Sequence, residues 1–178
     1  EKSNIPFVLN ASLASFGAYF CMYAFRKPFS VATFEGMEVF HIDYKIIVII
    51  AQVLGYALSK FIGIKVVSEL KANQRAYYLL GLILISELAL VLFALVPQPY
   101  NVVLMFLNGV PLGMIWGIVF SYLEGRKFTE ILGVALSTSF IVSSGVVKSV
   151  GFFVMDSWGF SEFWMPAITG ALFVLPLL

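Results

Sequence analysis

Two stretches of the chain place a cation beside tyrosines at helical spacing. Tyr19, Tyr23 and Arg26 follow one another at i, i+4 and i+7, and Tyr56 and Lys60 are spaced i, i+4. In an α-helix these spacings put the side chains on one face. Arginine offers a planar fork of donors that suits a phosphate or a carboxylate, and tyrosine hydroxyls add donors without charge. We therefore predict that these residues bind a small anion with several oxygens.

Further ionisable side chains lie in apolar surroundings, namely Lys27, Glu87 and Lys148. Such a side chain inside a bilayer costs ~2.5–3.5 kcal/mol on insertion scales, so it is a functional candidate. Because the cations outnumber the acid, the pattern favours a cavity that an anion visits. The alternatives are that Lys27, Lys60 and Lys148 extend their charged ends to the membrane surface, and that Glu87 pairs with one of them.

The composition requires a membrane environment. Of 178 residues, 61% are hydrophobic and 12% are charged, whereas soluble domains carry about 25% charged residues. The net charge of +1 provides no field that would attract nucleic acid, and the single cysteine excludes an intramolecular disulfide. The sequence thus excludes a soluble domain, a disordered chain and nucleic-acid binding. It indicates a chain that crosses the lipid bilayer several times.

Long apolar segments, each near the ~20 residues that cross a bilayer, must position these side chains. We predict an all-α integral membrane fold with one transmembrane domain over residues 1–178. Its spans are expected at about 5–28, 44–64, 76–96, 101–123, 130–155 and 162–178. Gly109, Gly113 and Gly117 in the fourth span are predicted to let helices approach closely. The spans carry no nucleophile–base pair, metal cluster or cofactor motif, so we expect no catalytic residues, no metal and no cofactor.

Basic residues gather in two of the connections between the spans. Lys65, Lys71 and Arg75 follow the second span, and Arg126 and Lys127 follow the fourth. Because cytoplasmic loops carry an excess of Lys and Arg, both termini and these loops are expected in the cytoplasm. We expect an integral protein of a bacterial inner membrane.

The two triplets of spans share a pattern. Lys60 and Lys148 each fall in the second span of a triplet, as expected of the inverted 3+3 repeat that builds each half of a major facilitator transporter. The sequence also ends within an apolar run. We therefore expect one half of a larger protein, whose partner is a missing C-terminal six-helix half.

Two runs, residues 19–30 (YFCMYAFRKPFS) and 55–63 (GYALSKFIG), resemble helices 1 and 2 of a known transporter group. They are similar to the organophosphate:phosphate antiporters, the glycerol-3-phosphate transporter type of the major facilitator superfamily. Residues 68–75 resemble a degraded form of the superfamily's loop between helices 2 and 3. The resemblance implies the N-terminal six-helix half of that fold.

The resemblance also implies roles for single residues. It makes Arg26 the phosphate-contacting arginine with Lys27 as its neighbour, Tyr19, Tyr23 and Tyr56 the pore tyrosines, and Lys60 the helix 2 lysine. The sequence departs from the pattern at Pro28, where these antiporters usually have asparagine. It departs again at Ser139 or Phe140, which stands near the position of their helix 5 histidine.

Taken together, these features predict a secondary active transporter of a small organic anion. A phosphate ester exchanged for phosphate is one candidate pair. The protein would work by alternating access, in which two six-helix halves rock about a site near the midplane. Lys27, Glu87 and Lys148 are expected to take part in coupling or in salt bridges. The alternatives are a facilitator of another small solute, and a transporter-like membrane sensor that binds its ligand without transport.

Overall fold

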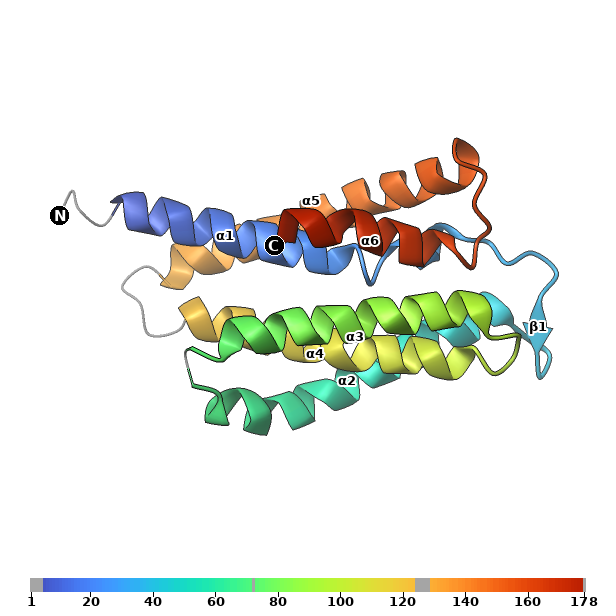
Figure 1. The fold of residues 1–178 in the computed structure, drawn as a ribbon, viewed down its shortest axis with the longest axis horizontal. Coiled ribbons are helices and arrows are strands. Elements are labelled where there is room, and N and C mark those ends of the chain that lie inside the picture. The colour runs from blue at the N-terminus through green and yellow to red at the C-terminus, as the bar shows by residue number, and fades with distance from the viewer. Residues whose placement is uncertain (1–4, 72, 124–128, 178) are drawn as a thin grey trace.

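The chain is almost entirely helical in the computed structural model, which describes residues 5–71, 73–123 and 129–177 (Figure 1). The elements are α1 (Ile5–Tyr23), the 3-10 helix η2 (Pro28–Val31), β1 (Glu38–Val39), β2 (Ile42–Asp43), α2 (Tyr44–Glu69), α3 (Arg75–Leu95), α4 (Val102–Leu123), α5 (Thr129–Asp156) and α6 (Met165–Leu177). The strands β1 and β2 pair as a small antiparallel hairpin before α2. The predicted all-α fold is confirmed.

The first helix is shorter than the predicted span at 5–28. α1 ends at Tyr23, and the backbone amides of Arg26 and Lys27 both donate to the Tyr23 carbonyl oxygen in the turn that follows. Pro28 then begins η2. A proline has no N–H for the helical ladder and its ring clashes with the carbonyl of the residue four positions earlier, which disfavours continuation of the helix. Arg26 and Lys27 therefore lie in a turn.

Four helices within the described residues are long and apolar enough to cross a membrane. They are α2, α3, the segment Val102–Val119 of α4 and the segment Ser137–Asp156 of α5. In α6 the apolar stretch Met165–Pro176 is shorter. Large apolar side chains are exposed along these helices, which together with their length indicates an integral membrane protein. Arg126 and Lys127, which entered the prediction of orientation, lie outside the described residues.

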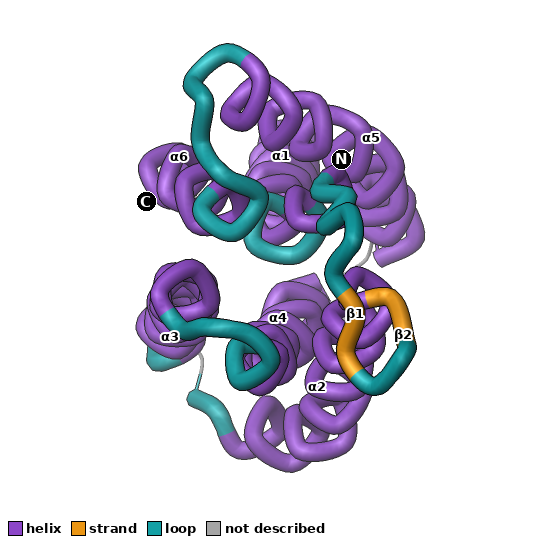
Figure 2. The backbone as a smooth tube through the Cα atoms, turned by 90° about the vertical axis from the view of Figure 1, so that its right-hand side faces the viewer, coloured by secondary structure: helices purple, strands orange, loops and turns teal. Residues whose placement is uncertain are grey.

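The helices form two groups of three that lie against each other. One group holds α1, α5 and α6, and the other holds α2, α3 and α4 (Figure 2). Within them, α1 packs along α5 and contacts α6, while α4 packs along both α2 and α3. The groups meet where α1 contacts α4 and where α3 contacts α6. We refer to them as the α1 layer and the α4 layer.

Within the α4 layer, glycines bring the backbones of α2 and α4 into contact. A Cβ atom at Gly109 would meet the carbonyl oxygen of Gln52, and one at Gly113 would meet the hydroxyl of Ser59. The predicted packing role of these two glycines is therefore confirmed. Gly117 is looser, because its Cβ would lie 3.4 Å from Val67 Cγ2.

A buried network of polar side chains joins the three helices of the α4 layer. The Gln52 amide nitrogen donates to Asn108 Oδ1 at 2.8 Å, and Asn108 Nδ2 donates to Ser86 Oγ at 2.7 Å and to the Ser86 carbonyl oxygen at 3.2 Å. All three residues are buried. Hydrogen bonds between polar side chains stabilise helix association where the surroundings are apolar.

At one end of the molecule, Glu162 joins the connection after η2 to the connection before α6. Its Oε1 accepts from the Thr33 amide at 2.6 Å and from the Thr33 hydroxyl at 2.9 Å, and its Oε2 accepts from the Phe34 amide at 3.0 Å. Phe34 has a positive φ of 52°, a conformation that costs free energy for a residue other than glycine. The ring of Phe34 is buried and packs against Tyr44 and Phe163. These contacts hold Phe34 in that conformation.

Candidate functional site

Two cations lie close to the ring of Tyr56. The guanidinium carbon of Arg26 is 4.1 Å from the centre of the ring, and the Lys60 ammonium nitrogen is 4.8 Å from it. Arg26 belongs to the turn after α1, whereas Tyr56 and Lys60 lie one helical turn apart on α2. Each cation is attracted to the electron-rich ring, by about 0.5–1 kcal/mol where water has access. The structure thus brings together two stretches that the sequence separates by thirty residues.

Local contacts fix the turn that carries Arg26. The Ser30 hydroxyl donates to the Lys27 carbonyl oxygen at 2.7 Å, which closes the next turn of the chain. Pro28 packs on Gly151 of α5, where a Cβ would lie 3.3 Å from the proline Cβ. The turn is therefore held against α5.

The tyrosines of α1 complete the cluster. The rings of Tyr19 and Tyr23 are 5.4 Å apart, both side chains are buried, and Tyr19 lies beside Tyr56 and Arg26. The Tyr23 hydroxyl is buried and has no hydrogen-bond partner within the described part of the chain. A buried donor without an acceptor costs about 1–3 kcal/mol. All the residues that the spacing predicted to bind an anion therefore lie in one place, and we call Tyr19, Tyr23, Arg26, Tyr56 and Lys60 the cation–tyrosine cluster.

Positions 139 and 140 of α5, which the resemblance compares with a substrate-site histidine, adjoin this cluster. The ring of Phe140 packs edge-on against Tyr23, with the centres 5.2 Å apart. The Ser139 hydroxyl donates to the Phe16 carbonyl oxygen at 2.8 Å and is buried between α5 and α1. Ser139 therefore takes part in helix packing, and Phe140 supplies an apolar wall.

Two more cations lie near Arg26. Lys27 is half-buried, and its pKa is lowered by burial and by the positive charges of Arg26 and Lys148. Lys148 is exposed on α5. In the residues that the structure describes, none of Arg26, Lys27, Lys60 and Lys148 has an acidic side chain within salt-bridge distance. The positive charge at this site is thus not neutralised by the described part of the chain.

Glu87 lies apart from these cations, on α3 where it faces α6. One carboxylate oxygen is buried without a hydrogen-bond partner among the described residues, and it lies against Gly170 and near the ring of Phe25. Glu87 and Lys148 therefore do not pair here. No group of three or more His, Cys, Asp or Glu side chains that could hold a metal ion occurs in the described ranges.

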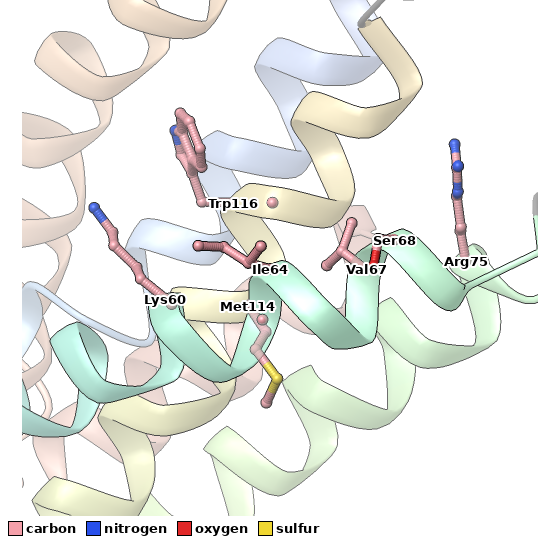
Figure 3. Close-up of a pocket in the computed structure, with 10 residues that line it drawn as sticks. Lys60, Ile64, Val67, Ser68, Arg75, Met114 and Trp116 are labelled. Atoms are coloured by element: carbon pink, nitrogen blue, oxygen red, sulfur yellow. The ribbon is translucent and has the colours of Figure 1, made fainter.

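A groove that the sequence did not predict extends from the cluster along α2 and α4. It has a volume of about 550 Å³, and Lys60, Ile64, Val67, Arg75, Met114 and Trp116 are among its lining residues. Figure 3 shows Lys60 beside Trp116 at one end and Arg75 at the other, with Ile64 and Val67 between them. The Lys60 nitrogen is 5.7 Å from the centre of a Trp116 ring. We call this hollow the α2–α4 groove.

Trp116 gave no distinct signal in the sequence, because a single tryptophan in an apolar span is common near membrane surfaces. Gly113 is required for the close contact of α2 and α4, and Trp116 lies one helical turn after it on α4. This position puts Trp116 beside Lys60. A pattern that combined both helices would have been needed to find it.

The chain was compared with known families and proteins. No curated protein and no solved structure matches it significantly. The family model described as a family of unknown function, DUF5690, matches residues 28–178. This match includes Tyr56, Lys60 and the whole α2–α4 groove, and it begins two residues after Arg26. The chain therefore belongs to the DUF5690 family.

Proposed function

We propose that this chain is the N-terminal half of a secondary active transporter for a small organic anion. The observation that carries the proposal is that Arg26 and Lys60 both lie close to the Tyr56 ring, 4.1 Å and 4.8 Å from its centre, without an acidic partner in the described residues. Like charges this close repel each other. An anion bound beside the ring would be attracted by both cations and would remove that repulsion.

The chemistry of the cluster favours an anion with several oxygens. Arg26 supplies a fork of donors, Lys60 supplies a mobile ammonium group, and the buried Tyr23 hydroxyl offers a further donor. Phosphate and carboxylate groups accept several such bonds at once. A phosphate ester exchanged for phosphate, as the resemblance implies, is the first pair to test.

The packing of the helices supports an inverted 3+3 repeat of six spans. If α1, α2 and α3 correspond to α4, α5 and α6, the contact of α1 with α5 corresponds to that of α4 with α2. The contact of α1 with α6 likewise corresponds to that of α4 with α3, and the α1–α4 and α3–α6 contacts correspond to themselves. Such a repeat is the plan of each half of a transporter that works by alternating access.

In this proposal the second half of the transporter covers the cluster from the opposite side. The site then opens alternately to the two sides of a bacterial inner membrane, with the termini of the chain in the cytoplasm. Lys27 and Lys148 raise the positive potential around the site, and Glu87 holds a coupling proton away from it.

The experiment uses the intact protein in liposomes loaded with phosphate and measures the exchange of labelled external phosphate. We expect exchange that is lost in Arg26→Ala and in Lys60→Gln. The matched control is Lys45→Gln, because Lys45 belongs to the first turn of α2, outside the cluster.

Each other result has a defined reading. Binding of phosphate without exchange would contradict the transporter and favour a membrane sensor. Transport of neutral solutes that is unaffected by Arg26→Ala would favour a facilitator of another solute and contradict the anion site.

A further inference from the structure

We infer that the anion bound at the cation–tyrosine cluster is amphiphilic, with an acidic head at Lys60 and an apolar body in the α2–α4 groove. This inference rests on the proposed function and adds the chemical class of the substrate. It separates this site from one that takes only a small hydrophilic phosphate ester.

The head site and the groove are continuous because they share a residue. Lys60 lies over the Tyr56 ring and also lines the groove. On α2, Tyr56, Lys60, Ile64 and Val67 follow at i, i+4, i+8 and i+11, so they form one face of the helix. A ligand whose acid group lies at Lys60 therefore has Ile64 and Val67 directly beyond it.

The walls of the groove suit a hydrocarbon. Ile64, Val67, Met114 and Trp116 are apolar, and glycines of both helices also line it. A Cβ at Gly63 would lie 3.2 Å from the Met114 side chain, so glycine lets Met114 pack closely on α2 at this part of the groove. An alkyl or aryl group gains free energy from the same walls.

The charges at the groove separate it from a hollow that would accommodate a lipid tail. A second hollow of about 250 Å³ lies between α3 and α4, and apolar side chains line it throughout. The α2–α4 groove instead has the ammonium group of Lys60 at the end that meets the Tyr56 ring. Its volume of about 550 Å³ lies in the range of sites for small organic ligands. Charge complementarity therefore favours a soluble organic anion as the occupant.

The test measures binding of butanoate, hexanoate and octanoate to the intact protein in nanodiscs of neutral lipid, with octanamide as the uncharged match. We expect affinity to rise about two- to fourfold for each added methylene that enters the groove. Octanamide should bind at least ten times more weakly than octanoate. Lys60→Gln should weaken the binding of all three carboxylates.

Two variants show whether the alkyl chain of the ligand occupies this groove. Val67→Trp fills it, so the dependence on chain length should disappear while butanoate still binds. The control is Leu88→Trp, which fills the second hollow and should leave the series unchanged. Retained binding of butanoate shows that a variant has folded.

Several results would overturn the inference. These are equal affinity for butanoate and octanoate, equal binding of octanamide, or loss of octanoate binding when anionic lipid is added to the nanodisc, which would make a lipid the occupant. Phosphate exchange without any effect of chain length leaves the transporter standing and removes the amphiphilic substrate. Binding that depends on the length of the alkyl chain, without transport, would keep the amphiphilic ligand and remove the transporter.

Discussion

A carboxylate oxygen of Glu87 on α3 lies against the Cα of Gly170 on α6, at the place where any other residue would begin its side chain. The same Cβ would lie 3.0 Å from the buried ring of Phe25. A side chain at position 170 would require the Glu87 carboxylate to turn away and the Phe25 ring to shift. The contact also places an acidic group where the two layers of the molecule meet.

The first prediction concerns this contact. Gly170→Ala should lower the free energy of unfolding by about 1–3 kcal/mol, because it overpacks a site that is already filled. Thermal unfolding of the purified protein in detergent measures the effect. The control is Gly145→Ala on α5, where a Cβ meets nothing within 4 Å, so that variant should be neutral or up to about 1 kcal/mol more stable. A Gly170→Ala protein as stable as the control would contradict the contact.

The glycine contact between α2 and α4 gives a second prediction. Gly113→Ala should separate the helices and lower stability by about 1–3 kcal/mol, since the new methyl group meets Ser59. Gly81→Ala is the matched control, because a Cβ at that position on α3 lies in open space. Unfolding in a denaturing detergent, followed by circular dichroism, compares the two. Equal stability would show that α2 and α4 do not approach this closely.

The third prediction concerns the buried network of Gln52, Ser86 and Asn108. Asn108→Leu leaves the Gln52 amide and the Ser86 hydroxyl without partners, which should cost about 1–3 kcal/mol. Adding Gln52→Leu to this variant should recover part of the loss, because one unpaired buried group is removed. Stability measurements on both single variants and the double variant form the test, and strictly additive losses would count against a network.

The fourth prediction addresses Glu162. Glu162→Ala removes the acceptor for the amides of Thr33 and Phe34, so these amides should exchange with deuterium at least tenfold faster. Hydrogen exchange with mass spectrometry resolves the segment. Glu35→Ala is the control, because Glu35 is exposed in the same connection. Unchanged exchange in the Glu162 variant would contradict the bonds that join the two connections.

Periodicity explains which features could be predicted from the sequence. Apolar runs of bilayer length predicted where helices occur, and the i, i+4 spacing predicted that Tyr56 and Lys60 share a face. The approach of Arg26 to the same ring was expected only through the resemblance and the shared chemistry. It depends on the end of α1 at Tyr23 and on the turn before Pro28.

Features that depend on two distant segments could not be predicted. The α2–α4 groove exists because Gly113 lets α4 approach α2 while Trp116 stays at its margin. The bonds of Glu162 to Thr33 and Phe34 join positions more than 120 residues apart. Neither the groove nor these hydrogen bonds produce a periodic pattern within one helix, so a single sequence contains no signal for them.

The backbone contact of α2 and α4 also determines which charges can move relative to each other. No side chain separates the two helices at Gly109 and Gly113, so we expect them to move as one unit. This unit carries Tyr56, Lys60 and Trp116. Arg26 belongs to the other layer. Sliding of one layer past the other would therefore change the distance between Arg26 and Tyr56 and leave that of Lys60 unchanged. The distance between the Arg26 guanidinium and the Tyr56 ring therefore reports the relative position of the two layers.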